Sequence, residues 1–154
     1  MILWMILIFS FSARPAEVSS EDSRQAGLLI GEIFVPGFED WTEEEQAAFA
    51  EKVDHPVRKT AHAAEYAVLG LLVAGAYKEG GKKGGKHVGE KRGRETFVPW
   101  IITTAYAATD EFHQLLVPGR SGQLSDVILD SAGALAGLLV LGAVRFFVRR
   151  RREE

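Results

Sequence analysis

The sequence predicts an all-α, polytopic membrane helix bundle with about four transmembrane helices. Four apolar blocks, 1–12, 60–77, 97–117 and 127–148, are separated by strongly polar segments, although the mean hydropathy of the whole chain is only +0.01. The last two blocks reach the length of about 20 residues that a helix needs to cross a bilayer core of about 30 Å. The charges between the blocks also alternate as membrane insertion requires.

The composition excludes several classes of protein. The 154 residues suit a single domain over 1–154, and 18 basic against 21 acidic residues give a net charge of −3. Nucleic acid is therefore not an expected partner. The chain has no cysteine, which excludes disulfides, thiolate metal ligands and cysteine catalysis.

The first block, 1–12, is shorter than an ordinary span. It has no basic start and no small-residue cleavage site, so a signal peptide is not favoured. Two interpretations remain. In the first, the sequence begins inside a longer span. In the second, a short helix crosses a locally thinned bilayer, and each Å of mismatch in length costs a fraction of a kcal/mol.

Segment 13–59 is expected on the extracytoplasmic side, because it holds 5 basic and 11 acidic residues. Thr42 followed by Glu45 has the spacing of a capping box, which predicts a short helix over about 42–53. Pro36 and Gly37 before this helix and Pro56 after it are expected to bound it.

Segment 78–96 is expected to be a flexible cytoplasmic linker, because it is rich in glycine and lysine and holds 7 basic and 3 acidic residues. The tail 145–154 holds 5 basic and 2 acidic residues and is placed on the same side. The short connection 118–126 is then outside, and both termini are cytoplasmic in a multi-pass protein of the cell membrane. No Walker-type phosphate loop is present.

Polar side chains gather at one predicted depth of the bundle. A charged residue near the centre of a membrane helix costs roughly 2.5–3.5 kcal/mol, so such residues usually face the interior of the bundle and serve a function. The predicted topology puts the polar residues of three blocks within about 10–15 Å of the outer surface. They are Lys59, His62, Glu65, Tyr66, Asp110, Glu111, His113, Gln114, Asp126 and Asp130.

Helical spacing divides these residues into faces. His62, Glu65 and Tyr66 share one helix face, and Asp110 with His113 and Gln114 repeats the pattern. Glu111 points about 100° away from Asp110 and is expected to have a different partner. After Asp130, the small residues over 133–137 indicate close helix packing rather than chemistry.

Structural interpretations of the same residues remain open. Polar residues near helix ends can act as interfacial anchors, and Asp126 can simply cap a helix that opens near it. Arg120 can pair with a carboxylate and neutralise the cluster. Alternatively, Arg120 can contact a phosphate or carboxylate of a ligand in bidentate fashion.

The residues also show a family resemblance. The stretches KTAHAAEYAVLG at 59–70, TDEFHQLLVPGRSGQLSD at 109–126 and DSAGALAG at 130–137 resemble the VanZ-like family of small integral membrane proteins. The IFSFS at 8–12 resembles the end of that family's first span. The family's polar motif falls on Lys59, His62, Glu65, Tyr66, Asp110, Glu111, His113, Gln114, Pro118, Gly119, Arg120 and Asp126. Asp130 departs from the pattern, since such proteins often have asparagine there.

The predicted topology makes the polar residues face the outer side. The resemblance implies a multi-helix integral membrane protein, and the name-giving members of the family reduce susceptibility to the lipoglycopeptide teicoplanin. Expected partners are membrane lipids and a lipid-linked cell-wall intermediate or the lipoglycopeptide itself. The residues leave three hypotheses open: a binding or modifying protein, an intramembrane enzyme and a structural protein. For an enzyme, the catalytic candidates are Asp110, Glu111, His62, Glu65 and His113, acting either by acid–base chemistry or with a divalent metal. The binding candidates are Lys59, Tyr66, Gln114, Arg120 and Asp126.

Overall fold

A computed structural model describes residues 1–83 and 93–153 of the chain, and this part is all helical. Its elements are α1 (Ile2–Ser12), α2 (Ala16–Phe34), the 3-10 helix η1 (Phe38–Asp40), α3 (Glu43–Lys83), α4 (Arg94–Gln114) and α5 (Leu124–Glu153). The all-α prediction is confirmed.

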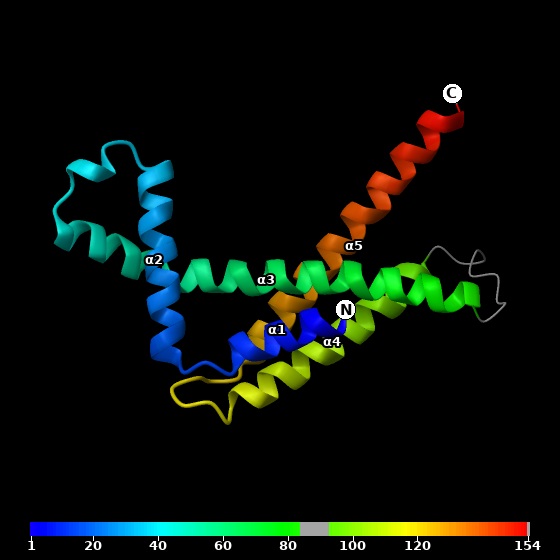
Figure 1. Ribbon diagram of the computed structural model, residues 1–154, viewed down its shortest axis with the longest axis horizontal. Helices are drawn as coiled ribbons and strands as arrows, with labels where there is room; N and C mark the ends of the chain where they lie inside the picture. Colours follow the sequence, from blue (N-terminus) through cyan, green and yellow to red (C-terminus); the bar gives the residue numbers. More distant parts are fainter. Residues whose placement is uncertain (84–92, 154) are drawn as a thin grey trace.

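Four helices form the bundle, and one crosses its end (Figure 1). α1 and α4 run in one direction, and α3 and α5 run in the other. α2 leaves α1 at an angle of 104° and lies across α3. The C-terminal half of α5 extends away from the other helices. The ends of α1 and α4 and the start of α5 therefore meet beside the middle of α3.

The first helix is mostly apolar, with serines at positions 10 and 12, and side-chain hydrogen bonds attach it to the bundle. Trp4 Nε1 donates to the carbonyl oxygen of Glu65 at 3.0 Å. The hydroxyl of Tyr106 donates to the carbonyl oxygen of Met5 at 2.7 Å. The core beneath these contacts consists of Ile8, Tyr66, Leu69, Val73 and Ala107.

Helix α2 lies within the segment for which the sequence predicts only a helix over about 42–53. Its buried residues are Ser23, Gly27 and Gly31, spaced four residues apart. A face of small residues buries little apolar area, so the hydropathy pattern does not reveal it. The side chains of Leu29 and Ile33, in contrast, are exposed.

Helix α3 joins the predicted helix 42–53 and the predicted span 60–77 into one helix of 41 residues. The capping box is confirmed: Glu45 Oε2 accepts the backbone N–H of Thr42 at 2.9 Å, and this bond holds the pKa of the Glu45 carboxyl below its usual value. The expected boundary at Pro56 is wrong, although proline lacks the N–H that an interior position needs. Contacts with α2 support the helix on both sides of Pro56: Ser23 bonds to Asp54, and Arg58 Nη1 donates to Ser20 Oγ at 3.2 Å.

The helices also extend into the predicted flexible linker 78–96. Residues 78–83 belong to α3 and residues 94–96 to α4, whereas residues 84–92 lie outside the described residues. Helix α4 ends at Gln114, three residues before the predicted end of its block.

Only part of the predicted set of four spans is supported by length and composition. In the described part, α5 passes as a candidate span over Leu124–Arg152, and α1 passes only together with α2 as a bent pair. The helices that contain 60–77 and 97–117 do not pass, because polar residues lower their hydropathy. Only 17% of the most apolar stretch of α5 is buried, so it is not the core helix of a water-soluble fold.

Candidate functional site

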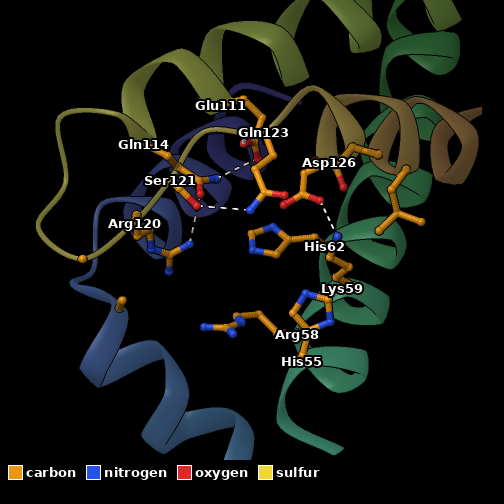
Figure 2. Close-up of a pocket in the computed structure, with 14 residues that line it drawn as sticks. His55, Arg58, Lys59, His62, Glu111, Gln114, Arg120, Ser121, Gln123 and Asp126 are labelled. Carbon is orange, nitrogen blue, oxygen red and sulfur yellow. Dashed lines mark hydrogen bonds and ion pairs between the residues drawn. The ribbon is translucent and has the colours of Figure 1, made fainter.

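A polar cavity of about 160 Å³ lies where α3, α5 and the segment between α4 and α5 meet (Figure 2). Six of the predicted site residues line it: Lys59, His62, Glu111, Gln114, Arg120 and Asp126. The remaining lining residues are Ala16, His55, Arg58, Gly119, Ser121, Gln123, Leu129 and Asp130. The polar groups of three distant stretches of sequence therefore surround one space.

One wall of the polar cavity is an ion pair between two helices. Lys59 Nζ of α3 lies 2.6 Å from Asp126 Oδ1 of α5. Both side chains are about one-third exposed. Asp126 thus links the helices. The capping position at the start of α5 belongs to Gln123, whose carbonyl accepts the backbone N–H of Asp126 at 3.0 Å.

Glu111 and Gln114 join the end of α4 to the start of α5. Glu111 Oε2 accepts the backbone N–H of Gln123 at 2.9 Å, and its Oε1 accepts Gln114 Nε2 at 3.1 Å. Asp110 instead accepts the hydroxyl of Ser12 in α1 at 2.7 Å. Ser12 and Gln123 are thus separate partners of the two carboxylates, as expected, but Gln114 is shared, because its Nε2 also donates to Asp110 Oδ2 at 3.4 Å.

Arg120 is a half-buried cation held by neutral oxygens. Its Nε donates to the carbonyl of Arg14 at 2.9 Å, its Nη2 to the carbonyl of Phe11 at 3.3 Å and its Nη1 to Gln114 Oε1 at 3.4 Å. Among the described residues no ion pair joins Arg120 to a carboxylate, so the pairing considered from the sequence is wrong. Gly119, at φ +73°, allows the turn that directs Arg120 back to α1.

Burial and a neighbouring charge both disfavour the charged form of Arg120. Burial lowers the pKa of its guanidinium, and the nearby cation of Arg58 lowers it further. Carboxylates, including Asp110, offset the shift only in part.

Four predicted site residues lie outside the polar cavity. Tyr66 is fully buried in the core, and Asp110 is buried beside Ser12. His113 faces α1, where its ring centroid lies 4.3 Å from that of Phe9. Glu65 lines a neighbouring cavity.

Several buried polar atoms around the site have no hydrogen-bond partner. They are His62 Nδ1, Tyr66 Oη, Asp110 Oδ1, His113 Nδ1 and Asp130 Oδ1. Two of these residues, His62 and Asp130, line the polar cavity. Because a buried polar atom without a partner costs free energy, these two are the groups of the cavity wall most suited to a ligand.

The second cavity, here called the elbow cavity, lies at the junction of α1 and α2 and has a volume of about 210 Å³. It shares Arg58, His62 and Arg120 with the polar cavity. The elbow cavity is otherwise lined by Phe11, Arg14, Ser19, Asp22, Ser23, Ala26, Val57, Ala61 and Glu65.

The positions of the histidine and carboxylate side chains bear on the two kinds of catalysis considered from the sequence, acid–base catalysis and metal catalysis. His62 Nδ1 lies 3.7 Å from Glu65 Oε2, so a carboxylate and an imidazole are adjacent. In the described ranges, 1–83 and 93–153, no three His, Asp or Glu side chains are grouped so as to hold a metal ion.

Arg58 and His55 are cavity residues that the sequence interpretation did not select. Arg58 lies four residues and His55 seven residues before His62, so both share its helix face. That periodicity was available in the sequence. For His55 the periodicity applies only if the helix continues through Pro56, whereas the sequence predicts a helix boundary there.

These features define a helical protein with one or two candidate membrane spans and a polar cavity between its helices. The chain belongs to the VanZ/LLP1 family, whose model matches residues 1–145, and this confirms the resemblance drawn from the polar motif. The family is membrane-associated. Comparison with curated proteins and with solved structures gave no match.

Proposed function

We propose that this chain is a four-span protein of the cell membrane with both termini in the cytoplasm and the polar cavity on the outer side. In this proposal the cavity binds an outer-leaflet lipid or a lipid-linked cell-wall intermediate. Binding there reduces susceptibility to teicoplanin-type lipoglycopeptides, as the name-giving members of the family do.

The observation that supports binding is a hollow space with charged walls. A purely structural set of polar contacts is best packed closely, because charged groups without partners in a low dielectric are costly. Here about 160 Å³ remains between the helices, and His62 projects into it (Figure 2). The structural contacts are made by other residues, such as Lys59 with Asp126.

The test compares drug susceptibility in a teicoplanin-sensitive bacterium that expresses wild-type protein, His62→Ala or Thr60→Ala. Within the described residues His62 makes no hydrogen bond, so its loss removes a cavity group without breaking a hydrogen bond between helices. Thr60 is exposed on a different face of the same helix and serves as the matched control. Removing a ligand contact costs about tenfold or more in affinity. We therefore expect His62→Ala to lose most of the protection and Thr60→Ala to retain it.

Membrane levels of each variant are measured by immunoblot. If well-expressed wild-type protein gives no protection, the teicoplanin function is refuted. If His62→Ala protects as well as wild type, the polar cavity is not the site of that function.

An intramembrane enzyme is the second candidate, and the adjacency of His62 and Glu65 favours it. At 3.7 Å the two groups are adjacent but not hydrogen-bonded, and a closer approach in a complex would let the carboxylate orient the imidazole for proton transfer. Glu65→Gln keeps the size of the side chain and removes its basicity. A Glu65→Gln protein that still binds lipid but gives no protection supports catalysis, whereas retained protection excludes it for this pair.

A further inference from the structure

The elbow cavity has an excess of basic side chains on one part of its wall. Arg14, Arg58, Arg120 and His62 line it, against the two carboxylates of Asp22 and Glu65. Asp22 is 2.6 Å from Arg14, and Glu65 is 3.7 Å from the imidazole of His62, which is a cation only when protonated. Three guanidinium groups thus line the elbow cavity against two carboxylates, and Arg58 and Arg120 are the two that have no counterion on its wall in the described residues.

These two arginines lie at the wall common to both cavities, and one of them lacks a counterion. Arg58 is 3.2 Å from Asp54, whereas Arg120 contacts only carbonyl and amide oxygens in the described part of the chain. Two neighbouring cations at a half-buried position repel each other. An anion between them would relieve this repulsion and satisfy the planar guanidinium groups.

The rest of the elbow cavity is mainly apolar. Phe11, Ala26, Val57 and Ala61 contribute carbon surface beside the arginines. A cavity that combines cationic groups with apolar walls is complementary to an amphipathic anion rather than to a free inorganic ion.

The position of the cavity favours a ligand that comes from the membrane. Because α2 leaves α1 at 104°, an α1 that crosses the membrane leaves α2 near the plane of the membrane surface. Arg120 donates to the carbonyls of Phe11 and Arg14 at this bend. Its guanidinium is then at the depth of the lipid head groups.

We infer that the elbow cavity binds an anionic membrane lipid, with its phosphate between Arg58 and Arg120 and an acyl chain against Phe11, Val57 and Ala61. The inference rests on the membrane orientation of the proposed function, and it assigns a ligand class to the cavity that adjoins the polar cavity at Arg58, His62 and Arg120.

The test uses the full-length protein in phosphatidylcholine nanodiscs that contain a fluorescent phosphatidylglycerol or the equally labelled phosphatidylcholine. Binding is followed by energy transfer from the protein's tryptophans. Wild type is expected to bind phosphatidylglycerol about tenfold more tightly than phosphatidylcholine. Arg58→Gln and Arg120→Gln are each expected to abolish most of this preference.

Arg24→Gln is the matched control. Arg24 is exposed in α2 and lies outside both cavities, and its replacement by glutamine removes the same positive charge. Because Arg120→Gln also removes hydrogen bonds to α1, thermal unfolding is measured for each variant, and Arg58→Gln tests the site without that complication. Ala61→Phe, which fills the apolar part, is expected to weaken binding of phosphatidylglycerol while both arginines remain.

Three outcomes would overturn the inference. Equal affinity for the two lipids would exclude an anion site, and an equal loss in Arg24→Gln would reduce the effect to general charge attraction. Displacement of the lipid by millimolar inorganic phosphate alone would make free phosphate the ligand. Because binding is measured without the drug, a lipid preference with no protection in cells refutes the proposed function alone. Protection without a lipid preference refutes the inference alone.

Discussion

Glu111 shows how a residue in a family motif can act by positioning others. Its carboxylate accepts the backbone N–H of Gln123, just before α5 begins, and the side-chain amide of Gln114. Gln114 in turn accepts a hydrogen bond from Arg120 at 3.4 Å. Loss of Glu111 would therefore disturb the start of α5 and the support of Arg120 together, which makes His62 the better probe of the cavity.

The ion pair between Lys59 and Asp126 is predicted to link α3 and α5 energetically. Both side chains are about one-third exposed, so the coupling free energy is expected to be about 0.5–1 kcal/mol. A double-mutant cycle with Lys59→Met and Asp126→Asn, measured by unfolding in mixed detergent micelles, gives this value. Strictly additive effects of the two substitutions would show that the pair contributes nothing to stability.

At the scale of elements, small residues decide how closely the helices approach. In α5, a Cβ added at Gly137 would lie 2.8 Å from the carbonyl oxygen of Ala67 in α3, and one at Gly133 would collide with the carbonyl of Ala63. A Cβ at Gly70 in α3 would lie 3.1 Å from the carbonyl oxygen of Ala134. This close crossing holds the polar ends of both helices around one cavity.

Gly133→Ala is therefore predicted to destabilise the bundle by about 1–3 kcal/mol, because the backbones of α3 and α5 must separate to admit the methyl group. Gly142→Ala, in the same helix with nothing within 4 Å of the added Cβ, is the control. It is expected to be neutral or to stabilise by up to about 1 kcal/mol. Thermal unfolding in detergent compares the two variants, and equal stabilities would contradict the close packing.

At the scale of the whole molecule, the helices expose large apolar side chains on the surface of the bundle. Large side chains such as Leu139, Val140 and Phe147 of α5 are more than half exposed. Helix α3, at 41 residues, is about 60 Å long, twice the thickness of a bilayer core. In the proposed topology, the first part of α3 and α2 therefore extend beyond the membrane.

The proposed topology predicts which single cysteines are accessible from outside. The natural chain has no cysteine, so Glu51→Cys and Arg151→Cys each introduce one thiol. Both positions are exposed. A membrane-impermeant maleimide is expected to label Glu51→Cys in intact cells and Arg151→Cys only after permeabilisation. Labelling in the opposite order would reverse the orientation and place the polar cavity on the cytoplasmic side.

The sequence by itself determined the helical class, the family and six of the fourteen residues that line the polar cavity. It could do so because long apolar blocks, a capping box and polar residues at helical spacing are local patterns. The separate roles of Asp110 and Glu111 followed from the angle of about 100° between successive residues of a helix.

Tertiary structure alone decided the rest. Helix α2 buries Ser23, Gly27 and Gly31, and its contacts support α3 on both sides of Pro56. The continuous helix places His55, before the proline, on the face of His62. Arg120 turned to carbonyls of α1 rather than to a carboxylate. Each of these outcomes depends on contacts between segments distant in sequence. Local hydropathy contains no record of such contacts, because small residues and backbone carbonyls make them.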